Sequence, residues 1–131
     1  MVSWQIYNLF WVIITILIPF AVLVAGLFAR IGLPKRVNWI VGYRTFMSMK
    51  NKETWVFAHK YVGKWWTICG IFFIIVAFVG MIIIELEILT LEPAIFVAIV
   101  AIAALVILVI ALIFTEIALR KEFDKNGKRR Q

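Results

Sequence analysis

The side chains that could do chemistry are concentrated in one basic, aromatic stretch, residues 38–64. Arg44 carries a planar fork of N–H donors, which suits a lipid phosphate, a carboxylate such as that of Glu53, or the carboxyl end of a peptide. We favour a structural pair between Arg44 and Glu53. His59 could sense pH, but a solvated or hydrogen-bonded helix histidine is the simpler interpretation. The stretch therefore predicts a binding or scaffold region rather than a reactive centre.

Enzyme chemistry finds little support in these residues. A serine triad would need an aspartate near Ser48 and His59, and the one aspartate is Asp124, in the C-terminal tail. Acid–base catalysis by Glu53 and Glu116 is a weak alternative. The sequence has no glycine-rich phosphate loop and no zinc-ligand spacing, and its single cysteine lies in an apolar run. It therefore predicts no enzyme, no cofactor and no metal site.

Composition places the chain in a membrane. Hydrophobic residues make up 65% of the 131 residues and the mean hydropathy is +1.04, which is more apolar surface than one soluble core can hide. The formal net charge is +7. Because the Lys and Arg lie between long apolar runs, this charge fits a bilayer with an anionic inner leaflet better than it fits nucleic acid. We expect a lipid-embedded protein that does not bind nucleic acid.

Three uncharged runs are each long enough to cross the hydrocarbon core, which takes about 20 residues of helix. They cover about residues 4–29, 65–84 and 93–115. The loop at 30–64 contains a helix N-cap at Asn51 and a short helix that could end near Gly63 or continue into the second span. We predict a single all-α membrane domain over residues 1–131, with three transmembrane helices and an interfacial cytoplasmic loop and short helix between the first two. The charged tail, residues 120–131, is predicted to continue the third helix briefly and then become disordered.

The positions of Lys and Arg predict the direction of the spans. Residues 30–64 hold eight, the tail holds six, and the Glu85–Glu92 connection holds none. The eight are Arg30, Lys35, Arg36, Arg44, Lys50, Lys52, Lys60 and Lys64. By the positive-inside rule, the long loop and the C-terminus are cytoplasmic and the N-terminus is outside. We expect a multi-pass protein of the bacterial inner (plasma) membrane.

Small residues recur at helical spacing on all three spans, where they allow close approach of another backbone. They are Ala21, Ala25 and Ala29 on the first span, Gly63, Gly70 and Ala77 on the second, and Ala94, Ala98, Ala101, Ala104, Ala111, Thr115 and Ala118 on the third. We favour packing within one monomer, with a homo-oligomer as the alternative. The apolar cores hold no ionisable residue, which argues against a self-contained proton-coupled transporter.

Four loop residues have structural interpretations that compete with binding. Gly42 is expected to permit a tight turn, and Asn38 to hold the loop through backbone groups. Tyr43 and Trp55 could line a groove or anchor the loop at the membrane interface.

A multi-position pattern runs through the same loop. It reads Asn38-x-x-x-Gly42-Tyr43-Arg44-Thr45, then Ser48-Met49, Asn51, Glu53, Trp55, Ala58-His59 and Gly63. This pattern resembles the signature loop of the SdpI/YfhL family of bacterial integral membrane proteins. The site residues that the resemblance marks are Asn38, Gly42, Tyr43, Arg44, Thr45, Glu53, Trp55 and His59.

The resemblance implies a toxin-immunity-related membrane protein. Such a protein would confer resistance to a secreted membrane-active peptide toxin, or signal its presence, with the toxin or a cytoplasmic regulator as partner. One alternative is a membrane adaptor that docks a cytoplasmic regulator or a lipid headgroup. Another is a subunit of an oligomeric transporter.

Overall fold

The three apolar runs form three long helices, α1 (Val2–Arg30), α2 (Lys52–Glu85) and α3 (Pro93–Glu122). The computed structural model describes residues 2–31 and 34–130, with side chains from Ile6 onward. Each helix is long and apolar enough to cross a membrane. The chain is therefore an all-α, multi-pass membrane protein, as the sequence predicts.

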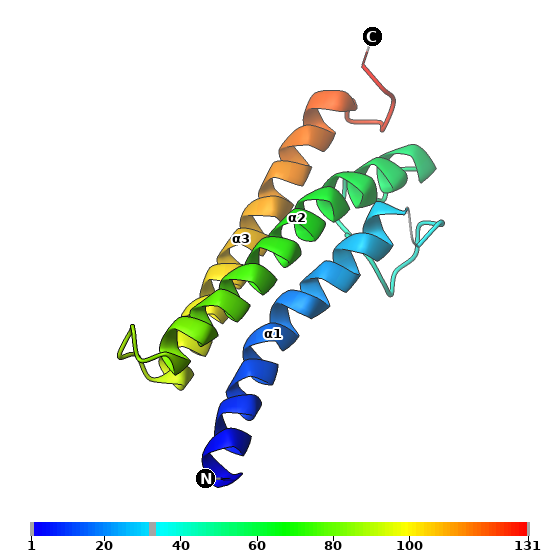
Figure 1. Ribbon diagram of the computed structural model, residues 1–131. Helices are drawn as coiled ribbons and strands as arrows, with labels where there is room; N and C mark the ends of the chain where they lie inside the picture. Colours follow the sequence, from blue (N-terminus) through cyan, green and yellow to red (C-terminus); the bar gives the residue numbers. More distant parts are fainter. Residues whose placement is uncertain (1, 32–33, 131) are drawn as a thin grey trace.

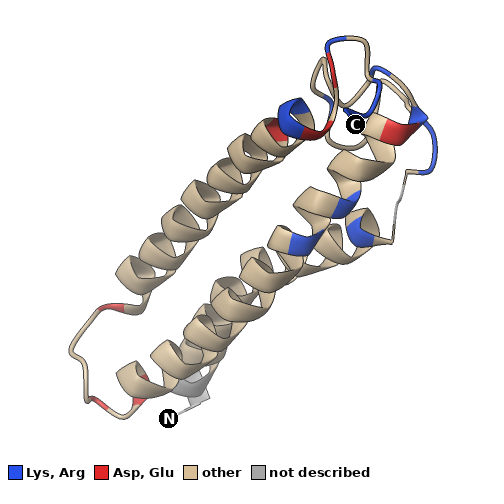
Figure 2. Cartoon of the chain, turned by 90° about the horizontal axis from the view of Figure 1, so that it is seen from above, with Lys and Arg blue, Asp and Glu red and all other residues tan. Residues whose placement is uncertain are grey.

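The helices run up, down and up beside one another, so the N-terminus and the C-terminus lie at opposite ends of the bundle (Figure 1). α2 packs against both neighbours, most extensively against α1. We call the end that carries residues 34–51 and the tail the loop end, and the end that carries residues 86–92 the turn end. Lys and Arg gather at the loop end (Figure 2).

α2 is one continuous helix of 34 residues, so the short helix predicted after Asn51 runs directly into the second span. Its start is fixed by the predicted N-cap: Asn51 Oδ1 accepts hydrogen bonds from the backbone N–H groups of Glu53 and Thr54, both at 2.9 Å. Thr54 Oγ1 accepts in return from the N–H of Asn51. From Lys52 to Trp65 the helix rises by about 20 Å. The first part of α2 therefore extends well beyond the apolar run.

Glycine brings α1 and α2 into close contact. An added Cβ on Gly70 would lie 2.7 Å from the Leu23 backbone, and one on Gly63 would collide with the backbone at Ala29 and Arg30. On α3 the buried small residues are Ala104, Ala111 and Thr115. These parts of the predicted stripes are used for packing inside the monomer, where small side chains permit close van der Waals contact between helices in lipid.

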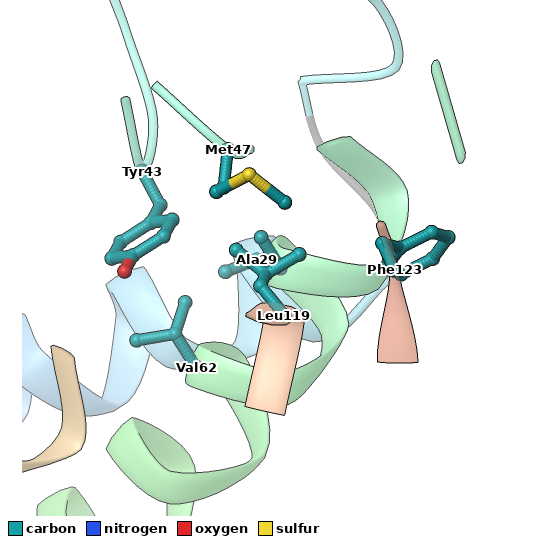
Figure 3. Packing of buried hydrophobic residues seen from close by; sticks show 7 residues of the cluster. Ala29, Tyr43, Met47, Val62, Leu119 and Phe123 are labelled. Atoms are coloured by element: carbon teal, nitrogen blue, oxygen red, sulfur yellow. The ribbon is translucent and has the colours of Figure 1, made fainter. Parts of the chain in front are cut away.

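The best-packed region lies at the loop end. Seven buried residues form one cluster there: Ala29, Tyr43, Met47, Ala58, Val62, Leu119 and Phe123. They come from all three helices, the loop and the tail, and their side chains gather between the helix ends and the loop (Figure 3). A smaller cluster of Phe73, Val100 and Ala104 joins α2 to α3. The loop and tail are therefore part of the core rather than attachments to it.

The prediction that the tail continues the third helix briefly is confirmed, because α3 ends at Glu122, but the prediction that the tail then becomes disordered is wrong. After α3 the chain turns back on itself: the N–H of Asp124 donates to the carbonyl of Lys128 at 2.8 Å, and Phe123 is 1% exposed. Asn51 Nδ2 donates to the carbonyl of Gly127 at 2.7 Å, which fastens the tail to the N-cap of α2. The tail thus joins the loop end.

Local turn chemistry explains this order. The Asp124 carboxylate accepts hydrogen bonds from the N–H groups of Lys128 (2.8 Å) and Asn126 (2.9 Å), and these bonds hold the pKa of Asp124 below its ordinary value. Gly127 takes a φ of +79°, which glycine adopts without strain. An Asp followed three residues later by Gly is a turn signal that the high charge of the segment obscured.

Candidate functional site

The loop between α1 and α2 begins with a turn organised by Asn38. Its Oδ1 accepts hydrogen bonds from the N–H groups of Ile40 (3.0 Å) and Val41 (2.8 Å), and its Nδ2 donates to the carbonyl of Arg36 (3.1 Å). An asparagine side chain that bonds to nearby backbone in this way stabilises a turn. The scaffold role predicted for Asn38 is confirmed.

Gly42 lies where the loop meets α2. Its φ of +116° is disfavoured for residues with a side chain, and an added Cβ would collide with Nε2 of His59 and lie 3.2 Å from Cη2 of Trp55. Both the backbone conformation and the available space therefore require glycine here. The predicted tight turn is present, with close packing as a second reason for it.

His59 holds the loop through both ring nitrogens. Nε2 accepts a hydrogen bond from the N–H of Tyr43 at 2.9 Å, and Nδ1 lies 2.8 Å from the carbonyl of Trp55. These partners require a neutral imidazole with its proton on Nδ1, because Nε2 must offer a lone pair. Trp55 is fully buried, and its Nε1 donates to the carbonyl of Pro34 at 2.6 Å. His59 is thus a buried, hydrogen-bonded residue of the kind favoured from the sequence.

Tyr43 connects the loop to α3. Its phenol oxygen lies 3.2 Å from the carbonyl of Leu112 and 3.3 Å from Oε2 of Glu116, so its one proton can be donated to either. Burial raises the pKa of Tyr43 to about 12, and the Glu116 carboxylate adds to the shift. The phenol is therefore a neutral donor at any physiological pH.

A set of hydroxyl groups closes the second half of the loop. Ser48 Oγ accepts from the N–H of Thr45 at 2.9 Å and donates to the carbonyl of Tyr43 at 2.8 Å. The hydroxyl of Thr54 is within hydrogen-bonding distance of the Ser48 carbonyl. Ser48 and Thr54 are fully buried, yet neither is among the eight predicted site residues. The short Thr45-x-x-Ser48 spacing, typical of hydroxyl-capped turns, was the available signal.

The predicted pair between Arg44 and Glu53 is wrong. Arg44 Nη1 donates to the carbonyl of Trp39, and the Glu53 carboxylate lies 3.9 Å from the guanidinium of Arg129. Folding of the tail brings Arg129 to Glu53, and the sequence-based prediction of a disordered tail excluded that partner. Both Arg44 and Glu53 are exposed.

The eight predicted residues therefore separate into two groups. Six of them hold the loop end together through hydrogen bonds or close packing, and two, Arg44 and Glu53, are exposed charged residues. The six are Asn38, Gly42, Tyr43, Thr45, Trp55 and His59, of which Tyr43, Trp55 and His59 are buried. Ser48 and His59 each bond to the backbone of Tyr43 and not to each other. Across the part of the chain that the structure describes, no three His, Cys, Asp or Glu residues are grouped to hold a metal ion.

The loop also borders an open apolar pocket between α1 and α2, which we call the loop pocket. Its volume is about 380 Å³. Its lining residues are Ala25, Phe28, Ala29, Pro34, Val41, Gly42, Tyr43, His59, Val62 and Trp66. Beside it the loop exposes two large apolar side chains, Trp39 (81%) and Ile40 (83%). The site can thus accommodate an apolar group and can contact the membrane, whereas its polar groups are occupied in holding the loop.

Comparison with known proteins identifies the family. No curated protein and no solved structure matches the chain. The family model described as the SdpI/YfhL protein family matches residues 35–115, which include the loop, α2 and most of α3. This family comprises membrane proteins of an immunity-related type. The match extends over more than half of the chain and contains all eight predicted site residues, so the chain belongs to the SdpI/YfhL family.

Proposed function

We propose that this membrane protein protects a bacterial cell from a secreted, membrane-active peptide toxin, by intercepting the peptide or by relaying its presence. Family membership supports an immunity-related role in general. The observation that carries the specific proposal is that the family-matched residues build one hydrogen-bonded loop, in which Trp39 and Ile40 are exposed beside an apolar pocket. A peptide that acts on membranes carries apolar side chains, which this surface could bind.

The charge distribution supports a cytoplasmic location for the loop end. All fourteen Lys and Arg lie in residues 30–64 and 120–131, whereas the turn end carries Glu85, Glu87 and Glu92. In this orientation the loop surface meets the inner leaflet. The protein would then act on a peptide that has entered the membrane.

Protection assays test this proposal. The protein is expressed in a sensitive strain, which is challenged with candidate membrane-active peptides. We expect protection by the natural sequence, and loss of protection when Trp39 and Ile40 are both replaced by Ala. The matched control is Leu89→Ala, an exposed apolar residue at the turn end. If the correctly inserted protein protects against none of the peptides, or if the Trp39 and Ile40 changes have no effect, the proposal fails.

A groove at the loop end favours a second candidate, an adaptor that docks a cytoplasmic regulator. This groove, of about 500 Å³, lies between the start of α2 and the tail and is lined by Lys52, Glu53, Val56, Phe57, Lys60, Phe123 and Arg129. Its three cations outnumber its one carboxylate, so together with the apolar side chains it suits an acidic, partly apolar protein segment. A photo-crosslinking side chain at position 57 discriminates the candidates, since recovery of lipid alone would exclude a protein partner.

A further inference from the structure

His59 makes a contact between the loop and α2 that depends on its charge. Its Nε2 accepts a hydrogen bond from the backbone N–H of Tyr43 at 2.9 Å, and its Nδ1 lies 2.8 Å from the carbonyl of Trp55. A protonated imidazole carries a hydrogen on each nitrogen and has no lone pair left to accept with. Its Nε2–H would then point at the N–H of Tyr43. The bond from the loop to α2 therefore requires a neutral ring.

In the described part of the chain, no carboxylate is paired with His59. Among the residues that line the loop pocket with it, the one other titratable side chain is Tyr43, whose phenol stays neutral, and the α1 residues are all apolar. On α3, Glu116 lies beyond the phenol of Tyr43 and pairs with Arg120 at 2.9 Å. The charged residues next to His59 and Tyr43 in sequence are exposed cations, Lys60 and Arg44. Protonation would thus leave an uncompensated charge on a side chain that is buried.

The bonds that hold the loop on either side of this contact do not titrate near neutral pH. The indole N–H of Trp55 donates to the carbonyl of Pro34, and the hydroxyl of Ser48 donates to the carbonyl of Tyr43. The phenol of Tyr43 lies against α3. The segment between these anchors, residues 39–42, is exposed. Loss of the imidazole contact would therefore free this segment from α2 and leave the anchors in place.

The free energy of this contact depends on pH in one direction. Burial lowers the pKa of His59 below its ordinary value, and the hydrogen bond to the Trp55 carbonyl opposes part of that shift. A histidine released from the contact returns to its ordinary pKa of about 6.5. The closed loop is therefore fully favoured above about pH 6.5, and the equilibrium constant for closing falls by up to about tenfold for each pH unit below that value.

We propose that His59 is a pH switch: its protonation releases residues 39–42 from α2 and opens the loop pocket, while the three helices stay packed. The use of this switch rests on the proposed function and on the proposed cytoplasmic location of the loop end. A peptide that permeabilises the membrane lets protons from an acidic medium reach the cytoplasm. The loop end would meet that acid, so the protein would respond to the damage that the peptide causes.

Hydrogen–deuterium exchange of the purified protein in lipid nanodiscs tests the switch, at about pH 7.5 and about pH 5.5 and corrected for the intrinsic pH dependence of exchange. We expect protection of residues 39–43 to fall about tenfold at the lower pH, with protection of α3 unchanged. His59→Gln offers an oxygen as acceptor and cannot take up a proton, so its protection should be equal at both pH values. Asn38→Ala is the matched control. It removes bonds that do not titrate, so it should raise exchange and keep the response to acid.

Equal protection of residues 39–43 at the two pH values in the natural sequence would overturn the proposal. So would an undiminished acid response in His59→Gln, or a loss of protection in α3 that accompanies the change in the loop. If His59→Gln fails to fold, exchange in the natural protein across the pH range still tests the switch, because the chain contains one histidine and a single-proton curve is expected. These measurements use no toxin, so failure of the switch is distinguishable from failure of the protection assay.

Discussion

Tyr43 and His59 are the central residues of the loop end. The backbone N–H of Tyr43 donates to His59 on α2, its carbonyl accepts from Ser48, and its phenol reaches α3. A buried polar group is costly when it is unpaired, so all three hydrogen bonds must be kept at once. Together they fix the position of Tyr43. The family-matched residues therefore act chiefly by positioning, and the surface that they position includes Trp39 and Ile40, which the family pattern does not mark.

A first prediction concerns Gly42. We expect Gly42→Ala to lower the free energy of unfolding by about 2 kcal/mol, because alanine is strained at a positive φ and its Cβ meets His59. Thermal unfolding in detergent measures the effect. Ile40→Ala, two residues away and on the surface, should change the midpoint little. Equal midpoints for the two variants would contradict this account of the glycine.

A second prediction concerns pH. The folded loop needs neutral His59, because protonated Nε2 cannot accept from the N–H of Tyr43. The unfolded state takes up a proton near pH 6.5 and below, so it binds more protons there than the folded loop does. Stability should therefore fall as the pH is lowered from 7.5 to 5, with a slope of up to about 1.4 kcal/mol per pH unit.

The control for this pH dependence is His59→Gln, which cannot titrate. Its melting temperature is expected to be lower at neutral pH and to respond less to acid. The comparison needs only melting curves of both proteins across the pH range. Parallel curves for the two proteins would show that another group is responsible.

Among the elements, α2 determines the architecture of the loop end. Its continuous helix contributes to the span, packs on α1 through glycine, and then projects beyond the apolar run to carry Trp55 and His59. Asn51 serves two elements at once, because its side-chain oxygen caps α2 and its side-chain nitrogen binds the tail. The start of α2 and the end of the chain are therefore coupled through one amide group.

Two substitutions at Asn51 separate these contacts. Asn51→Asp keeps the capping oxygen and removes the donor to Gly127, so we expect an intact helix with a released tail. Asn51→Ala removes both and should cost about 1–2 kcal/mol more in stability. Limited proteolysis at Lys125 and Lys128 reports release of the tail, and thermal unfolding reports the cap. A tail as protected in Asn51→Asp as in the natural protein would disprove the coupling.

Over the whole molecule, charge is distributed unevenly along the membrane normal. Lys and Arg gather at the loop end, and glutamates lie at the turn end (Figure 2). Cationic loops are retained on the cytoplasmic side during insertion. This asymmetry underlies the proposed orientation.

Cysteine labelling tests the orientation. In a Cys69→Ala background, a membrane-impermeant maleimide should label Leu89→Cys in intact cells. It should label Lys125→Cys only after the inner membrane is permeabilised. The reverse pattern would place the loop end outside and would remove the basis for a cytoplasmic partner.

Hydropathy predicted the three spans because the cost of burying charge in lipid limits each apolar run. Hydropathy alone underestimated the lengths of α2 and α3, because α2 already begins at Lys52 and α3 ends only at Glu122. Charged residues are compatible with a helix once it leaves the membrane. The eight site residues could be named from the loop pattern. The partners of Arg44 and Glu53 could not, because they depend on how the loop and a distant tail fold together.

Tyr43 contacts two different transmembrane helices, and this restricts how those helices can move relative to each other. Its amide is bonded to α2 and its phenol lies against α3, so the loop spans the distance between two helices that cross the membrane. A change in helix spacing within the bilayer cannot occur without stretching or breaking one of these contacts. The loop therefore ties α2 to α3 at this end of the bundle through a single residue.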